Sequence, residues 1–340
     1  MSAMMETTIQ QMAARGKGIL AADESTGTIK KRFDSIGIEN TEENRRAYRE
    51  LLFTTDNLAD YICGVICFEE TLDQSTKDGH NFTILLQEKG MVPGIKVDKG
   101  LIPLVNGKDE KTTQGLDGLP DRLAEYKAKG ARFAKWRVVY NIDTRKPSHL
   151  AIMTNAELLA RYAAICQSLE IVPIVEPELL MDGDHDIERC RFVSEMTFRQ
   201  VFAALARHHV VLEHMILKPS MIISGQNCAT QANVDTVASE TIKVLLRTVP
   251  AAVPSINFLS GGQSAELATQ HLNRMNALFP HLPWNLSFSY GRALQAPCLA
   301  AWKGNSANIA AAQKALFERA KLNSAACLGE YSESLESAVA

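Results

Sequence analysis

The sequence contains 340 residues, of which 46% are hydrophobic and 22% are charged. This is enough to bury the core of one large α/β domain or of two smaller ones. The formal net charge of −3 argues against a protein that wraps nucleic acid or binds an anionic membrane through charge, although short basic segments can still bind a small anion.

The cysteines and the N-terminal residues indicate the compartment. The seven cysteines include no CxxC pair, and Cys63 and Cys67 lie in the apolar run YICGVICF, where cysteine behaves as a small core residue. No basic segment followed by an apolar core begins the sequence, and no run of about 18 apolar residues occurs in it. These features predict a cytoplasmic protein with reduced thiols.

Short β-prone runs recur along the chain, and segments with helical patterns separate most of them. Several runs are nearly continuous in apolar residues, as expected of strands that helices cover on both faces. The expected strands are 18–23, 61–68, 92–97, 132–139, 171–177, 214–219, 256–261 and 286–292.

Two of the intervening segments carry capping patterns. Asn40 precedes Glu43 by three residues, and Thr154 precedes Glu157 in the same way, so each pair predicts the start of a helix. Apolar residues follow both pairs at helical spacing.

The alternation of strands and helices predicts parallel βα units. Eight such units favour a single-domain (β/α)8 TIM barrel, which we place in residues 1–322. An open doubly wound sheet is the alternative, but no GxGxxG pattern follows the first strand. Residues 323–340 are small and polar, and we expect them to form a loosely held tail.

Charged or polar side chains stand at the end of most of the predicted strands. In a barrel these ends converge on one face, where catalytic groups are found. A single charged strand end is more often a solvated residue or a structural ion pair, but so many together favour a shared active site. The set consists of Asp23, Lys96, Lys135 with Arg137, Glu176 with Glu178, Lys218, Ser260 and Arg292.

Lys218 has the clearest chemical meaning in this set. It follows an apolar run and precedes Pro219, so its amine is expected to lose hydration, which disfavours the ammonium form. A free amine can attack a carbonyl and form a Schiff base, whose protonated imine stabilises a carbanion on the neighbouring carbon. Carboxylates such as Glu176 can then move protons to and from the reacting oxygens.

This chemistry requires no metal or other cofactor, and the sequence predicts neither. None of the eight histidines forms an HExxH motif or pairs with cysteines at the spacing of a zinc site.

Two segments have the composition of phosphate-binding loops. SGGQS (260–264) contains Gly261 and Gly262 ahead of a predicted helix, and SYGRAL (289–294) places Ser289, Gly291 and Arg292 where the last strand meets a helix. They are loops seven and eight of the predicted barrel, which often bind phosphate. LSGGQ also occurs in ABC-type ATPases, but the chain contains no P-loop, so we reject that interpretation.

A third segment, DESTGTIKKRF (23–33), follows the first strand and offers Ser25, Thr28 and Arg32 around a glycine. Alone, these hydroxyls would be explained as helix caps. In one mouth with the other two loops, they predict a ligand that carries a phosphate at each end.

These motifs carry a family resemblance. GILAADESTGTIKKRF, GIKVDKGL, AKWR, VPIVEPE, ILKP, FLSGGQS and SFSYGRALQ resemble, in this order, segments of the class I fructose-1,6-bisphosphate aldolases from about Gly16 to Cys327. The resemblance implies a metal-independent (β/α)8 barrel, usually a homotetramer. It also implies reversible cleavage of fructose 1,6-bisphosphate into dihydroxyacetone phosphate and glyceraldehyde 3-phosphate, in glycolysis and gluconeogenesis.

The resemblance further implies a role for each matching residue. Lys218 would form the Schiff base, Glu176 would be the general acid/base of imine formation and C–C cleavage, and Glu178 would support it. The reacting centre would also include Asp23, Lys135 and Lys96, and Arg137 is similar to a substrate-site arginine. The ketose 1-phosphate would contact Ser260, Gly261, Gly262, Ser289, Gly291 and Arg292, and the other phosphate would contact Ser25, Thr28 and Arg32.

Two alternatives remain open. Another imine-forming barrel aldolase would act on a different sugar phosphate, with fructose 1-phosphate the first candidate. A binding or scaffold role would keep the same residues as structure, although the lysine, the acid and both phosphate clusters are all present. The sequence departs from the family at its end, because animal members end in a tyrosine that assists proton transfer, whereas here the last tyrosine is Tyr331.

Overall fold

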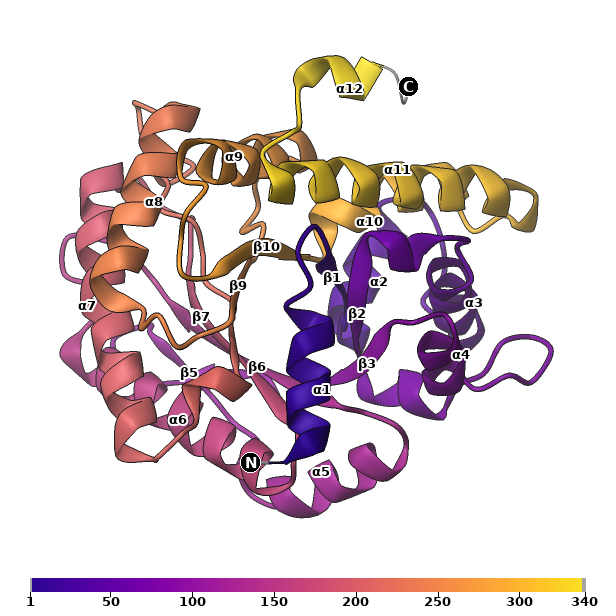
Figure 1. Ribbon diagram of the computed structural model, residues 1–340, viewed down its shortest axis with the longest axis horizontal. Helices are drawn as coiled ribbons and strands as arrows, with labels where there is room; N and C mark the ends of the chain where they lie inside the picture. The colour runs from indigo at the N-terminus through magenta and orange to yellow at the C-terminus, as the bar shows by residue number, and fades with distance from the viewer. Residues whose placement is uncertain (1, 338–340) are drawn as a thin grey trace.

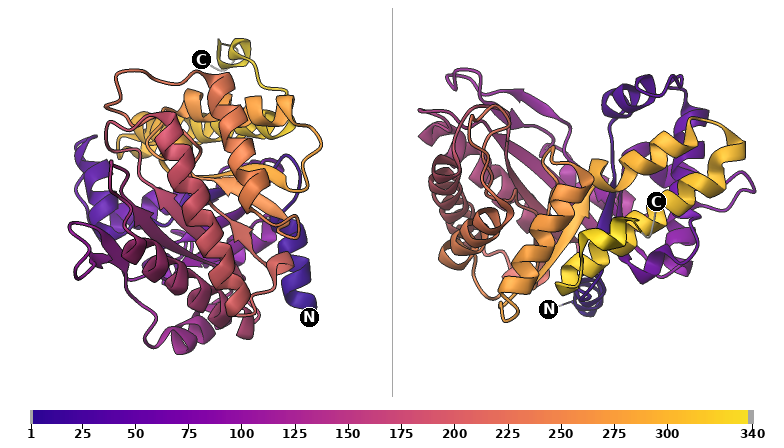
Figure 2. Two further views of the ribbon diagram at one scale, coloured as in Figure 1. Left: turned by 90° about the vertical axis from the view of Figure 1, so that its left-hand side faces the viewer. Right: turned by 90° about the horizontal axis from the view of Figure 1, so that it is seen from above.

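A closed barrel of parallel strands forms the centre of the computed structural model, which describes residues 2–337, and helices surround the barrel (Figures 1 and 2). The ring closes because the first strand pairs with the last, with Ile19 opposite Ser289. This architecture confirms the expected (β/α)8 barrel. Its strands are β1 (Gly18–Ala22), β2 (Ile62–Cys67), β3 (Val92–Lys96), β6 (Phe133–Tyr140), β7 (Val172–Leu179), β8 (Ile216–Leu217), β9 (Ser255–Phe258) and β10 (Asn285–Tyr290).

Every expected strand is present, but three of them end two or three residues earlier than predicted. Strand β8 contains only Ile216 and Leu217, although the backbone N–H of Lys218 still donates to Val175 of β7 at 2.8 Å. The next residue is Pro219, which has no N–H to continue the ladder. Strands β9 and β10 end at Phe258 and Tyr290, so Ser260 lies in a turn and Arg292 begins a helix.

Helices connect consecutive strands, and a short antiparallel hairpin of β4 (Leu101–Pro103) and β5 (Lys111–Thr113) lies between β3 and β6. Short 3-10 helices are η1 (Leu58–Asp60), η2 (Glu69–Asp73), η3 (Leu212–His214) and η4 (Ser306–Asn308). The helices outside the barrel are α2 (Thr26–Asp34), α3 (Glu42–Phe53), α4 (Phe82–Glu88), α5 (Leu119–Ala128), α6 (His149–Ser168), α7 (Ile187–Arg207), α8 (Val234–Thr248), α9 (Ala265–Leu278), α10 (Arg292–Trp302) and α11 (Ile309–Leu328).

Both helix caps were predicted at the wrong residue. The cap of α3 is Thr41 rather than Asn40, because the Thr41 hydroxyl accepts from the N–H of Asn44 at 3.1 Å. Helix α6 begins well before Thr154, since the Ser148 hydroxyl accepts from the N–H of Ala151 at 3.1 Å. Thr154 therefore lies inside the helix, where it caps nothing.

An additional helix, α1 (Ala3–Met12), closes the amino-terminal end of the barrel. It lies across the strands in Figure 1 and contacts β2, β3, β7 and η3. Its buried Met5, Ile9 and Met12 form one apolar cluster with strand side chains such as Phe133 and Ile174, separate from the larger core under the outer helices. Side chains of α1 therefore fill the interior of the barrel at this end.

The expectation of a loose tail from Asn323 is wrong for the residues up to Tyr331. Helix α11 continues to Leu328, and its Asn323 is fully buried, where it accepts a hydrogen bond from Thr269 at 2.8 Å. The helix ends at Gly329, whose φ of 75° suits glycine. After it, buried Tyr331 donates to Glu336 of α12 (Glu333–Ser337) at 2.9 Å, and the predicted tail residues 338–340 lie outside the described part of the chain.

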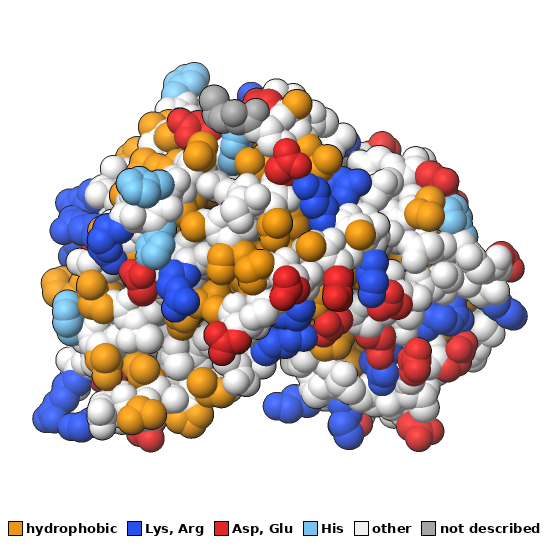
Figure 3. All heavy atoms as spheres, turned by 90° about the horizontal axis from the view of Figure 1, so that it is seen from below, with side chains coloured by type: hydrophobic (Ala, Val, Ile, Leu, Met, Phe, Trp, Pro, Cys, Tyr) orange, Lys and Arg blue, Asp and Glu red, His pale blue; other side chains and the backbone are white. Residues whose placement is uncertain are grey.

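The surface mixes apolar and charged side chains. In Figure 3, which shows the molecule from below, hydrophobic side chains lie among Lys, Arg, Asp, Glu and His side chains. The more exposed large apolar residues include Val105 near the β4–β5 hairpin, Phe192 of α7 and Leu246 of α8. Among the helices of residues 2–337, none is both long and apolar enough to cross a membrane.

Candidate active site

A cavity of about 280 Å³ lies at the carboxyl ends of the barrel strands. Every residue that the sequence predicted for catalysis or substrate binding lines this cavity, together with Ala21, Glu24 and Leu259. Strands β3, β6, β7 and β10, the loops after β1, β8, β9 and β10, and helices α2 and α10 supply the predicted residues. Closure of the barrel therefore brings together residues from most of the sequence.

Two lysines share the carboxylate of Glu176 at the centre of the cavity. Lys218 Nζ lies 3.2 Å from Glu176 Oε1, and Lys135 Nζ lies 3.3 Å from Oε2. Lys135 Nζ also lies 2.7 Å from Asp23 Oδ2. Lys135, Glu176 and Lys218 are each only 4% exposed, and such buried charges are tolerated when each has an opposite charge beside it.

The charges in this centre set the protonation states of its groups. Burial opposes ionisation of Glu176, but the charges of Lys135, Lys218 and Arg137 outweigh burial and lower the pKa of the carboxyl. The pKa of Asp23 is also lowered, since Lys135 and Lys218 together outweigh its burial. Burial opposes the charge of Lys135 in turn, but Asp23 and Glu176 raise its pKa. At neutral pH both carboxylates are therefore ionised and Lys135 is protonated.

Two more ion pairs flank the centre. Arg137 Nε donates to Glu178 Oε2 across the neighbouring strands β6 and β7, and this carboxylate raises the pKa of Arg137 despite its burial. Lys96 Nζ lies 2.7 Å from Oδ1 of the buried Asp98. Because both partners sit on or just after strands, these pairs are held by the barrel itself.

The three predicted anion segments lie around the same cavity. Ser25 Oγ and Thr28 Oγ1 are 3.2 Å apart at the amino-terminal end of α2. Gly261 and Gly262, after β9, have φ angles of 57° and 89°, which glycine adopts without strain. Helix α10 begins directly after Gly291. Hydroxyls, glycine N–H groups and helix N-termini are the groups that bind phosphate in proteins.

The glycines also give room to two arginines. A Cβ added to Gly262 would lie 3.2 Å from Arg292 Nη2, and one added to Gly291 would lie 3.5 Å from Arg32 Nη2. Arg292 therefore reaches from the start of α10 to the loop after β9, and Arg32 of α2 lies against the loop after β10. Arg32 thus stands between the two predicted phosphate clusters.

The centre of the cavity is balanced in charge. The carboxylates Asp23, Asp98, Glu176 and Glu178 match the cations Lys96, Lys135, Lys218 and Arg137. The excess of positive charge lies instead at the phosphate loops. There, Arg32 and Arg292 line the cavity, and Arg32 pairs with Glu24.

Sequence reasoning missed Glu24 and Asp98, which hold predicted cations in place. Glu24 directly follows Asp23, and Asp98 follows Lys96 by two residues, so each was within a motif already singled out. Their acidic side chains next to catalytic candidates were the available signal. The partner of Glu24 on α3, Arg49, carries no such local signal.

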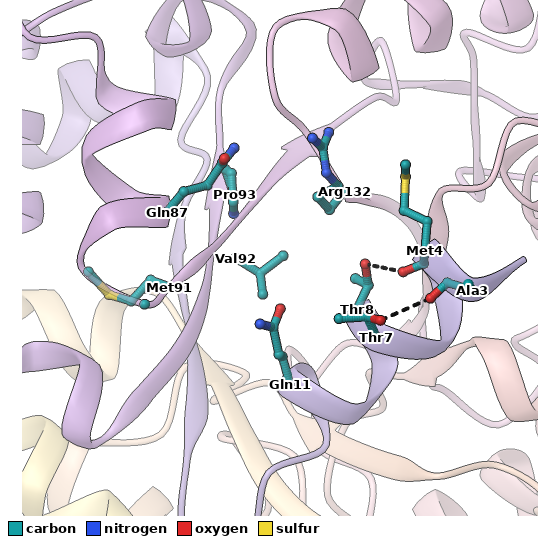
Figure 4. A pocket seen from close by; sticks show the side chains of 11 residues that line it. Ala3, Met4, Thr7, Thr8, Gln11, Gln87, Met91, Val92, Pro93 and Arg132 are labelled. Carbon is teal, nitrogen blue, oxygen red and sulfur yellow. Dashed lines mark hydrogen bonds between the residues drawn. The ribbon is translucent and has the colours of Figure 1, made fainter.

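A second cavity, of about 530 Å³, lies at the opposite end of the molecule between α1 and the start of β3 (Figure 4). Thr7 and Thr8 line it, but their hydroxyls donate to the carbonyls of Ala3 and Met4 within α1. Arg132 is the charged residue among those that line it. This cavity therefore offers no acid/base group comparable with Glu176.

The described residues do not form a group of three or more His, Cys, Asp and Glu side chains placed to hold a metal ion. The functional groups that the mouth offers are thus amines, carboxylates, guanidinium groups and phosphate-binding loops. Together they suit the reaction of a carbonyl compound that carries phosphate.

Comparison with known proteins agrees with this geometry. The sequence matches the family described as "Glycolytic: Fructose-bisphosphate aldolase class-I" over residues 4–340. A probable fructose-bisphosphate aldolase class 1 of Xanthomonas campestris pv. campestris is 57% identical over 325 residues, which cover 95% of this chain and 97% of that protein. Cytosolic fructose-bisphosphate aldolase 4 of Arabidopsis thaliana is 56% identical over 93% of this chain and 80% of its own length.

A solved structure gives the same result. The ternary co-crystal structure of fructose-bisphosphate aldolase from Plasmodium falciparum, in complex with TRAP and a small-molecule inhibitor, superimposes with a TM-score of 0.95. It is 52% identical in sequence, and the match covers 97% of this chain and 95% of that one. The chain belongs to the class I fructose-bisphosphate aldolases, the metal-independent lyases of glycolysis.

Proposed function

We propose that this aldolase cleaves fructose 1,6-bisphosphate through a Schiff base on Lys218. The observation that carries the proposal is the position of the buried Lys218 amine, 3.2 Å from Glu176, in a cavity that phosphate-binding loops surround. Nucleophile and proton-transfer group are thus within the distance that proton exchange requires.

In the proposed reaction, Lys218 Nζ attacks the C2 carbonyl of the ketose, and loss of water gives a protonated imine. The imine withdraws the electron pair of the C3–C4 bond, which breaks while the C4 hydroxyl gives its proton to Glu176. Glyceraldehyde 3-phosphate leaves, and an enamine remains on Lys218. Protonation of the enamine at C3 and hydrolysis of the imine release dihydroxyacetone phosphate and restore the amine.

The other charged side chains have supporting roles in this proposal. Lys135 holds the Glu176 carboxylate by charge, Asp23 holds Lys135 in turn, and Lys96 lines the same region. Glu178 is engaged with Arg137, so we assign it to the support of Arg137 and Glu176 rather than to proton transfer. Arg137 remains a substrate-binding residue because it lines the cavity.

We assign one phosphate to each side of the mouth. The ketose 1-phosphate binds Ser260, Gly261, Gly262, Ser289, Gly291 and Arg292, and the other phosphate binds Ser25, Thr28 and Arg32. The presence of both clusters favours a bisphosphate over fructose 1-phosphate as substrate.

The assembly and the compartment are further proposals. We infer a homotetramer from the family resemblance, and the exposed Phe192 of α7 and Leu246 of α8 supply apolar surface that a subunit contact would bury. A cytoplasmic location is supported by the name of the Arabidopsis relative, which is a cytosolic aldolase. Sedimentation equilibrium of the purified protein tests the tetramer.

Borohydride trapping tests the Schiff base. The protein is incubated with dihydroxyacetone phosphate and borohydride in the presence of EDTA, and the reduced adduct is mapped by peptide mass spectrometry. We expect a single adduct on Lys218 and none in Lys218→Met. An adduct on another lysine, or loss of cleavage activity in EDTA without an adduct, would overturn the proposal.

A further inference from the structure

A buried ion network lies behind the phosphate loops and connects the mouth to helix α3. Glu24 is 7% exposed and Arg49 only 3%. Arg49 Nη2 lies 2.7 Å from Glu24 Oε2, and Arg32 Nη1 pairs with Oε1 of the same carboxylate. Gln295 Nε2 donates to Glu24 Oε1 at 2.8 Å and to the carbonyl of Ala21 at 2.7 Å. One carboxylate thus joins a cavity-lining arginine to a buried one.

Within α3, the guanidinium of Arg49 lies 5.8 Å from the centre of the Tyr48 ring, and its ion pair is with Glu24 of another segment. The neighbouring buried residues of this helix are Tyr48, Leu51, Leu52 and Phe53, which pack in the apolar core. Burial of a guanidinium costs free energy, and an apolar side chain of similar size is often at least as stabilising. Arg49 therefore serves something other than packing.

The arrangement of charges around Glu24 suggests the role of Arg49. If Glu24 paired with Arg32 and not with Arg49, the negative charge of Glu24 would cancel the positive charge of Arg32 even without bound phosphate. Arg49 supplies a second positive charge to the same carboxylate, so the three groups together carry a net charge of +1. The half-buried Arg32 then still presents a positive field to the cavity that it lines.

We propose that Arg49 is a positioning residue for substrate phosphate: it neutralises Glu24 so that Glu24 can orient Arg32 without cancelling its charge. Arg49 does not line the cavity and acts only through Glu24 and Arg32. This inference rests on the proposed binding of sugar phosphates in the mouth, and it extends the binding site to a helix outside the barrel.

The chain offers a matched control for this role. Arg45 lies one helical turn before Arg49 on α3 and also pairs with a carboxylate, since its Nε and Nη2 donate to Glu70 at 2.7 and 2.6 Å. Neither Arg45 nor Glu70 lines the cavity. A change at Arg45 therefore removes a comparable ion pair from the same helix without altering the charge around Arg32.

The test compares Arg49→Met, Arg49→Lys and Arg45→Met in steady-state cleavage of fructose 1,6-bisphosphate and in competitive inhibition by inorganic phosphate. For Arg49→Met we expect KM and the inhibition constant of phosphate to rise about tenfold, as for weakening of one charged hydrogen bond, with kcat within about twofold. Arg49→Lys keeps the charge and should recover most of the affinity, while Arg45→Met should leave both constants unchanged.

A second variant keeps the test decisive if Arg49→Met folds poorly. In Glu24→Gln/Arg49→Met no buried carboxylate is left unpaired, and the net charge beside the phosphate loops returns to +1. Its KM should fall between those of Arg49→Met and the parent, because the positive charge of Arg32 is restored while its orientation by the Glu24 carboxylate is lost. The proposal is overturned if this double variant is as weak as Arg49→Met, if Arg49→Lys is as weak as Arg49→Met, or if kcat falls while KM stays constant.

Borohydride trapping distinguishes failure of this inference from failure of the proposed function on which it rests. Each variant is also reduced with borohydride at saturating dihydroxyacetone phosphate. An adduct on Lys218 in all variants shows that imine chemistry is intact, so that unchanged phosphate constants in Arg49→Met refute the role of Arg49 alone. No adduct in the parent protein refutes the proposed function, and the role of Arg49 falls with it.

Discussion

Lys218 Nζ lies 3.2 Å from Glu176 Oε1, and both side chains are almost completely enclosed by the barrel. Transfer of one proton from the amine to the carboxylate would leave a neutral nucleophile and a neutral carboxylic acid side by side. These are the two species that imine formation consumes, since the amine attacks the carbonyl and the acid protonates the departing oxygen. In the proposed mechanism, Lys135 on the other oxygen of Glu176 would keep this carboxylate aligned during the exchange.

Replacement of Glu176 by Gln removes the proton acceptor and keeps the size of the side chain. We expect kcat for cleavage to fall by roughly 10²-fold or more, the usual contribution of a general acid/base. Single-turnover cleavage and the reverse condensation should slow together, because both require the same proton transfers. Unchanged rates in both directions would show that another group moves these protons.

Arg292→Ala removes a guanidinium that lies against Gly262 in the loop after β9. Loss of one charged hydrogen bond to phosphate should weaken binding by roughly 1–3 kcal/mol, with a smaller effect on the chemical step. Calorimetric titration with dihydroxyacetone phosphate measures this loss. The assignment would fail if the parent protein bound phosphorylated and unphosphorylated ketoses equally well.

Ser25→Ala/Thr28→Ala removes the two hydroxyls that lie 3.2 Å apart at the start of α2. If they bind the phosphate distant from the ketone, KM for fructose 1,6-bisphosphate should rise while KM for fructose 1-phosphate stays constant. The ratio of kcat/KM for the two substrates is the measurement. Equal losses on both substrates would place these hydroxyls at the ketose 1-phosphate or in a purely structural role.

The stability of the protein should fall in mild acid because of a buried histidine. Burial lowers the pKa of His271 from 6.5 to about 4, and its Nδ1 lies 2.6 Å from the amide oxygen of Gln263. The unfolded chain binds a proton at higher pH than the folded protein does, so this contribution to stability is complete above about pH 6.5 and is lost as pH falls toward 4. The loss should reach about 3 kcal/mol, at about 1.4 kcal/mol per pKa unit.

Thermal unfolding midpoints between pH 4.5 and 7.5 check this expectation. His271→Gln should flatten the pH profile, and His281→Gln, which changes an exposed histidine, should not. A parent profile that is already flat would mean that another group compensates the protonation of His271. The same variant also alters the support of the phosphate loop, because Gln263 Nε2 donates to the Ser260 carbonyl at 3.0 Å.

The barrel and its mouth could be predicted from sequence because both depend on strong local signals. Apolar runs marked the strands, and in a parallel barrel the residues that follow them must converge, so the neighbourhood of Asp23, Lys135, Glu176 and Lys218 followed from topology. The helix caps were missed because several adjacent polar residues can serve, and Ser148 rather than Thr154 is the one in extended backbone before α6.

The remaining errors concern contacts between distant segments. Asn323 and Tyr331 have the polarity of an exposed tail, and only their contacts with α9 and, for Tyr331, with Glu336 show that they are buried. Likewise, nothing near Arg49 in the sequence indicates that its partner is Glu24. Pairing of this kind depends on how outer helices dock on the barrel, which no local pattern encodes.

The pairing of β1 with β10 has a consequence for synthesis on the ribosome. Ile19 is synthesised long before Ser289, yet they are partners in one ladder. In the proposed site, one phosphate binds after β1 and the other after β9 and β10, so a nascent chain could not hold a bisphosphate until the ring has closed. In the closed barrel, a ligand that occupies both loops would bridge the pairing of β1 with β10. Because such a ligand binds only the folded protein, the substrate would oppose separation of these two strands, which are far apart in the sequence.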